Sequence, residues 1–186
     1  MAAGGTPGNV VLGPGRLYYA PVGTADPTSA SAALPSAWTA VGYTDAGTTV
    51  STDVTSSPVE VAEEIDVIAN IITARSLTVA FAMAEATVGR LALALGGGAG
   101  VANDGTAFEF PDPANIVAVK FVWDSDEVPG ASNRRWIFRS CVPSGTIAVA
   151  RQKAPNKSTI PVTFNVTKSA SGAGPVKVFP NASGLV

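Results

Sequence analysis

The chain has 186 residues, a hydrophobic fraction of 46%, a charged fraction of only 14% and a formal net charge of −2. A chain of this length is expected to form one domain that buries roughly 70% of its extended surface on folding. Histidine is absent and Cys141 is the single cysteine, which excludes Ser-His and Cys-His catalysis, the usual zinc sites and an internal disulfide. Cys141 lies in the strand-like run FRSCV and is predicted to be a small buried hydrophobe.

The charge is divided unevenly along the chain. Residues 1–115 hold eleven acids and three bases (net −8), whereas residues 116–186 hold three acids and nine bases (net +6). This asymmetry has two interpretations: uneven drift in surface composition, or a molecule with an acidic and a basic side that stacks head to tail with its copies. Neither half has the basic patch interleaved with aromatic residues that is typical of nucleic-acid recognition.

The N-terminal region begins with a Gly- and Pro-rich segment, residues 1–14, which is expected to be a flexible arm. It lacks the basic and apolar regions of a signal peptide, and no segment of the chain approaches the ~20 apolar residues of a membrane span. A strand is predicted over residues 15–23, with Leu17 and Tyr19 on one face. After a small-residue loop, the expected packing anchors are Trp38, Val41 and Tyr43, followed by an Asp-Ala-Gly turn at 45–47.

Residues 48–70 carry five acids and no base: Asp53, Glu60, Glu63, Glu64 and Asp66. The alternating pattern over 48–72 ends in Ile68, Ile71 and Ile72 and predicts a long acidic hairpin. This hairpin is either solvated or an arm that reaches onto a neighbouring subunit. An exposed Ile-rich edge alone would invite aggregation, which favours the arm.

The segment after the hairpin changes from strand to helix. Leu77, Val79, Phe81 and Met83 alternate with small residues, which predicts a strand with one large apolar face. A helix is then predicted over 86–96, capped by Thr87 and stopped by the glycines at 96–98. Its core-facing stripe is expected to be Val88, Leu91 and Leu95, so that the helix covers the open side of the sheet.

The basic half predicts three further strands, over residues 116–124, 134–142 and 158–168. Trp123 and Trp136 stand in apolar alternation, which favours core packing. Val117 is expected on the same face as Trp123, and Pro161 suits an edge or a bulge. The main β domain therefore spans 15–168, with a basic strand-to-loop connection over 146–157 and a linker plus one short strand over 169–186.

Searches for catalytic and ligand-binding patterns give negative expectations. The Gly-rich run at 96–100 follows a helix, whereas phosphate-binding loops precede one. The acids between Glu60 and Asp66 lack EF-hand spacing, which favours a solvated surface over a metal site. No pair of carboxylates is singled out for catalysis. We therefore predict no enzyme activity, no catalytic residues, no metal and no cofactor.

Three stretches together resemble the tail tube (major tail) proteins of long, non-contractile-tailed bacteriophages. They are GRLYYAPVGT at 15–24, PSAWTAVGYT at 35–44 and RSLTVAFAMAE at 75–85, followed by the Leu-rich helix. The resemblance implies a mainly β fold, a β-sandwich or half-barrel with one short flanking α-helix and a long hairpin arm. It also implies hexameric rings that stack into a tube conducting DNA and ejection proteins.

The resemblance assigns candidate roles to the charged residues. Residues 48–72 match the hairpin position of the family, which makes Glu60, Glu63, Glu64 and Asp66 candidate lumen or ring-contact groups. An acidic lumen would repel DNA phosphates and let the DNA slide. Our hypothesis is that ring closure continues one β-barrel across subunits. Stacking would then pair the acidic hairpin with basic side chains, either Arg134 and Arg135 or Arg151, Lys153 and Lys157.

The partners implied are further copies of the chain, the tape-measure, tail terminator and distal tail proteins, and DNA in passage. The implied location is the virion tail, assembled in the host cytoplasm without membrane insertion of this chain. The alternative is another β-sandwich virion component, such as a capsid decoration protein, or a carbohydrate-binding module. A binding module should expose an aromatic platform, whereas the three tryptophans here stand in apolar alternation.

Overall fold

The computed structural model describes residues 15–60, 66–98, 109–125, 134–149, 152–153, 156–170 and 172–179. The expected N-terminal arm, residues 1–14, lies outside this part of the chain. The described elements are β1 (Arg16–Pro21), β2 (Thr39–Ala40), β3 (Thr44–Val59), β4 (Ala69–Met83), α1 (Val88–Ala94), the 3-10 turn η2 (Pro113–Asn115), β5 (Val119–Ser125), β6 (Arg134–Ser144), β7 (Ile160–Val166) and β8 (Val176–Phe179).

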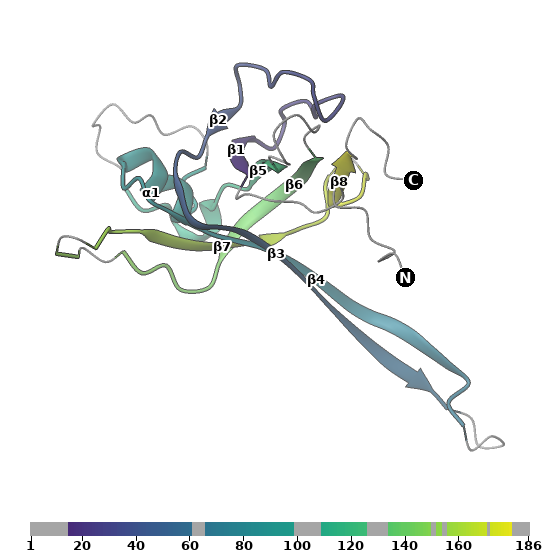
Figure 1. The fold of residues 1–186 in the computed structure, drawn as a ribbon. Helices are drawn as coiled ribbons and strands as arrows, with labels where there is room; N and C mark the ends of the chain where they lie inside the picture. Colours follow the sequence, from purple (N-terminus) through teal and green to yellow (C-terminus); the bar gives the residue numbers. More distant parts are fainter. Residues whose placement is uncertain are drawn as a thin grey trace, which may run out of the picture.

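The strands form one antiparallel sheet in the order β2-β1-β5-β6-β7-β4-β3, and β8 pairs with β6. The first half of β6 pairs with β8 and its second half with β7, so both strands lie along the same edge of β6. Figure 1 shows these strands in the body of the molecule and the β3–β4 hairpin projecting from it. The predicted mainly β fold with one short helix is confirmed.

The sheet is strongly curved, as three phenylalanine rings show. Phe81 of β4 and Phe121 of β5 are separated by three strand spacings, which is roughly 14 Å in a flat sheet. Their ring centroids nevertheless lie 5.7 Å apart, and the ring of Phe164 of β7 meets that of Phe121 edge to face with the centroids 4.7 Å apart. The sheet therefore curls around its own apolar face, which is the half-barrel form of the predicted architecture.

A second, smaller core covers the other face of β1, β5 and β6. Trp38 packs there with Ala20, Val122 and Ile137, and the loop between β1 and β2 lies over them. Trp38 and Val41 are buried as predicted. The prediction for Tyr43 is wrong, because 79% of this residue is exposed and its backbone N–H donates to Glu85 at the sheet margin.

The helix α1 forms where predicted but presents a different face to the core. Thr87 caps it by accepting from the Arg90 N–H, and Gly96 ends it at φ +86° while the Gly97 N–H donates to the Ala92 carbonyl. The buried hydrophobic side chains are Leu93, Ala92 and Ala94, whereas Val88, Leu91 and Leu95 are only half-buried. Leu91 of the predicted stripe packs against the main core, but Val88 and Leu95 do not belong to that core. In a seven-residue helix rich in apolar side chains, periodicity selects no single face.

The expected Asp-Ala-Gly turn at 45–47 is a β-bulge. Strand β3 runs through it, and the register against β4 shifts between Asp45 and Thr48. Ala46 and Gly47 have φ of +56° and +81°, the left-handed conformation that a bulge of this kind accommodates. The turn residues were recognised, but the strand continues past them because β4 supplies a partner on both sides.

The strands of the basic half agree closely with their patterns. In β7, Ile160, Val162 and Phe164 are buried and alternate with Pro161 and Asn165, which are exposed. Strand β5 begins at Val119, three residues later than predicted, and leaves Val117 50% exposed, so its expected place in the core was wrong. Cys141 is buried as predicted, and this burial raises the pKa of its thiol. Among the described residues, no helix is long and apolar enough to cross a membrane.

Candidate functional site

The most distinctive feature of the structure is the outer part of the β3–β4 hairpin, which we call the arm (residues 52–77). Strand β4 pairs with β7 only from Thr78 to Met83, so beyond that point β3 and β4 pair only with each other among the described strands. From Thr52 to Val59 the arm extends roughly 25 Å at the usual rise per strand residue. Figure 1 shows it projecting well clear of the sheet.

The arm exposes more apolar surface than its own fold can cover. Ile71 and Ile72 are 57% and 66% exposed, and Val54, Val67 and Ile68 are similarly open. A two-stranded hairpin is at best marginally stable in water without packing on a third layer. The isoleucines singled out in the sequence therefore lie on a surface that is suited to being covered by another molecule.

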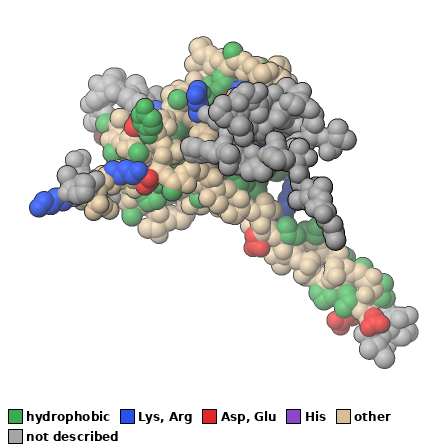
Figure 2. Space-filling view, in the orientation of Figure 1, with side chains coloured by type: hydrophobic (Ala, Val, Ile, Leu, Met, Phe, Trp, Pro, Cys, Tyr) green, Lys and Arg blue, Asp and Glu red, His purple; other side chains and the backbone are tan. Residues whose placement is uncertain are grey.

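Two of the four acidic candidates are described, and both lie at the end of the arm. Glu60 directly follows β3 and Asp66 precedes β4, and both are exposed. The Ile68 N–H donates to the Val59 carbonyl, which brings these two segments together. Figure 2 shows the acidic side chains beside apolar ones at this end. Glu63 and Glu64 lie outside the described residues.

Arg135, one of the proposed stacking partners, is committed inside the subunit. It lies opposite Asp124 on the neighbouring strand β5, and its Nε and Nη2 atoms donate to the two carboxylate oxygens at 2.6 and 2.8 Å. Its Nη1 donates to the carbonyls of Ser29 and Ala32, which fastens the β1–β2 loop to the sheet. Only 4% of Arg135 is exposed, so its guanidinium is not available for a contact with another copy of the chain.

The remaining basic candidates belong to two separate parts of the fold. Arg134 is half-buried at the start of β6, beside β5. Lys153 and Lys157 are exposed on the segment that leads into β7, where Lys157 Nζ lies 2.5 Å from a carboxylate oxygen of Asp45. Arg151 lies outside the described residues. Lys153 and Lys157 thus belong to one segment, whereas Arg134 lies on β6.

Part of the charge asymmetry is neutralised within the subunit. Asp26, from the acidic half, accepts from Lys120 and Arg139 of the basic half, each at 2.8 Å. Burial alone would raise the pKa of Asp26, but the hydrogen bonds from Lys120 and then Arg139 outweigh it and lower the pKa. Because that pKa is lowered on folding, the contact stabilises the protein at neutral pH and loses its effect as the pH falls through the pKa of Asp26.

Two surface features were missed by the sequence analysis. Strand β3 ends the strand order, so its outer edge has no partner among the strands that the structure describes. A pocket of about 420 Å³ opens between α1 and residues 149–160 and is lined by Leu91, Val149 and Ile160 among others. The sequence feature that could have indicated the pocket is the apolar face of the helix. Val88 and Leu91 were recognised as an apolar stripe but assigned to the core.

The described residues contain no group of three or more His, Cys, Asp or Glu side chains that could hold a metal ion. Trp123 and Trp136 pack against the main core with their ring centroids 6.2 Å apart, and Trp38 is buried in the second core. The tryptophans therefore do not form the exposed platform expected of a carbohydrate-binding module.

The chain is therefore a mainly β protein with a curved antiparallel sheet, a projecting arm, an open strand edge and an apolar surface pocket. The model of the family described as "Phage tail tube protein" matches residues 4–177, and the chain belongs to this family. It is accordingly a structural protein of the phage tail. A comparison with the curated proteins gave no match.

Proposed function

We propose that the chain assembles with its own copies into rings, and that these rings stack into the tube of a phage tail. In this proposal the rings are hexameric and the bore conducts DNA into the host. Assembly takes place in the host cytoplasm, and the tape-measure, terminator and distal tail proteins are the other partners. The single observation that carries the proposal is the arm, which extends roughly 25 Å from the sheet with its apolar side chains exposed.

The open edge of β3 supports closure of a ring. An unpaired strand edge is a template for pairing with another chain, and ring closure removes such edges. The edge is long, because β3 runs from Thr44 to Val59. A neighbouring subunit that adds a strand here would extend the curved sheet into a barrel shared between subunits.

The charges of the arm support stacking of one ring on the next. Glu60 and Asp66 are exposed at its end, and Lys153 and Lys157 are exposed on the segment before β7. Attraction between these groups would orient successive rings in one direction, because the contact joins different surfaces of the two copies. Acidic side chains that face the bore would repel the DNA phosphates, so the DNA would not bind to the wall of the bore.

Charge reversal tests the stacking contact. The double variant Glu63→Lys/Glu64→Lys should assemble into few or no tubes and keep the fold of the subunit, because it reverses two charges of the acidic stretch 60–66 and alters no apolar residue. Electron microscopy counts the tubes, and circular dichroism reports the fold. The matched control is Glu109→Lys/Asp112→Lys, which makes the same change in charge at two exposed residues away from the arm. Tubes of normal length and number from the Glu63/Glu64 variant would contradict the proposal.

A further inference from the structure

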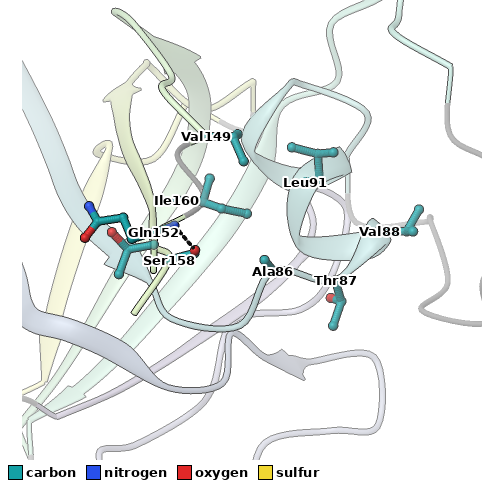
Figure 3. Close-up of a pocket in the computed structure, with 9 residues that line it drawn as sticks. Ala86, Thr87, Val88, Leu91, Val149, Gln152, Ser158 and Ile160 are labelled. Carbon is teal, nitrogen blue, oxygen red and sulfur yellow. Dashed lines mark hydrogen bonds between the residues drawn. The ribbon is translucent and has the colours of Figure 1, made fainter. Parts of the chain in front are cut away.

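The pocket beside α1 is a preformed apolar recess. Its volume is about 420 Å³, within the range of pockets that hold small ligands or several side chains. Figure 3 shows Leu91 of α1, Val149 of the loop and Ile160 of β7 gathered about the hollow between helix and loop. The Gln152 N–H donates to Ser158 Oγ at 3.0 Å, which joins two of the residues that line the pocket.

Both the wall of this pocket and the end of the arm expose aliphatic side chains. Val149 is 51% exposed at the pocket, and Ile68, Ile71 and Ile72 are between 57% and 66% exposed on the arm. Burying each of these side chains would lower the free energy of the assembly. Aliphatic side chains of this size fit an apolar recess without leaving a polar group unpaired.

The charges around the two surfaces are complementary. Lys153 and Lys157 are exposed on the loop that forms the pocket wall, and Glu60 and Asp66 are exposed beside the isoleucines of the arm. Within one subunit the two surfaces cannot meet, because the loop leading into β7 and the end of the arm lie at opposite ends of the molecule (Figure 1). Figure 2 shows acidic side chains at the end of the arm, and at the opposite end basic side chains with an acidic one beside them.

We propose that the end of the arm of one copy docks in the pocket between α1 and residues 149–160 of a second copy. Ile71 enters the apolar recess, whereas Ile72 lies on the opposite face of the hairpin. Glu60 and Asp66 face Lys153 and Lys157. The contact is heterologous, so each copy offers one arm and one pocket and the arrangement can repeat indefinitely. This inference rests on the proposed function, since it names the surfaces through which the copies join.

Cysteine cross-linking between two single variants tests the contact. One protein carries Ile71→Cys and the other, made distinguishable in mass by a tag, carries Val149→Cys; the native Cys141 is fully buried and does not compete. A docked pair is held at a millimolar effective concentration, so disulfide formation with diamide should be about a hundredfold or more faster than between undocked proteins at micromolar concentration. The matched control replaces Val149→Cys by Tyr43→Cys, a more exposed position away from the pocket.

The expected result is a mixed disulfide dimer from Ile71→Cys with Val149→Cys and little from Ile71→Cys with Tyr43→Cys. Equal capture by both partners, a dominant Ile71→Cys homodimer, or no mixed dimer at any concentration would overturn the docking proposal. Microscopy of the unmodified protein distinguishes the two failures. Tubes without the mixed dimer would remove the docking site and leave the tube, whereas the mixed dimer without tubes would leave the contact and remove the tube.

Discussion

Removing the arm is expected to abolish tube formation while leaving the subunit folded. Asp53 and Ser76 are paired across the hairpin, so residues 54–75 can be replaced by the two-residue turn Asn-Gly. Val50 is the last residue of β3 that packs against the main core, and it is retained. The shortened chain therefore keeps its core and loses the exposed apolar side chains and the acids of the arm.

The expected loss is large because several apolar side chains act together. Val54, Ile68, Ile71 and Ile72 are each about half to two-thirds exposed in the subunit. Burying the exposed part of each contributes roughly 1–2 kcal/mol, and losing all four weakens association by about a thousandfold or more. Sedimentation velocity should show no species larger than a single ring at concentrations where the full chain forms tubes.

Tryptophan fluorescence provides the control for folding, because Trp38, Trp123 and Trp136 all lie in the body of the subunit and none lies in the arm. The emission spectrum and the urea midpoint of the shortened chain should stay close to those of the full chain. A folded, shortened chain that still forms tubes would show that the arm is dispensable for assembly.

The second large effect is expected at the buried ion pair of β5 and β6. Asp124→Asn should lower the free energy of unfolding by about 3 kcal/mol or more, because it leaves the Arg135 guanidinium buried without its counter-charge. The same change should loosen the β1–β2 loop, since Arg135 also holds the carbonyls of Ser29 and Ala32. Urea unfolding monitored by tryptophan fluorescence measures both effects, since Trp38 is the last residue of this loop and packs in the second core.

The matched control for the buried pair is an exposed one. Lys157 and Asp45 also form an ion pair, but their side chains are 60% and 38% exposed. Solvent screens such a contact, so Lys157→Ala should change the free energy of unfolding by less than about 1 kcal/mol. A cost at Asp124→Asn no larger than that of Lys157→Ala would contradict the structural role assigned to Arg135.

Periodicity predicted the parts of the fold in which one face of a strand is buried. Leu17 and Tyr19 of β1 and the alternating residues of β7 lie where the pattern placed them. Such strands contact the core along their whole length, so the alternation of apolar and polar residues directly indicates which face is buried. Cys141 was predicted for the same reason.

The remaining features depend on tertiary contacts that no local pattern contains. Tyr43 is a large aromatic residue of the kind that usually packs in a core. The chain crosses the margin of the sheet at that point and leaves its ring in solvent. Arg135 was interpreted as a surface charge. Its partner, Asp124, lies on the neighbouring strand, and no local pattern in the sequence indicates that the two side chains form a buried ion pair. The pocket beside α1 combines residues of a helix, a loop and a strand, and only the fold brings them together.

The most direct test of the account is negative-stain electron microscopy of the purified full chain across a concentration series, with sizing chromatography alongside. The account predicts rings with a central channel that stack into tubes as the concentration rises, because both the open edge of β3 and the apolar arm gain cover only from further copies. A single small species, monomer or trimer, at every concentration would contradict self-assembly through these surfaces.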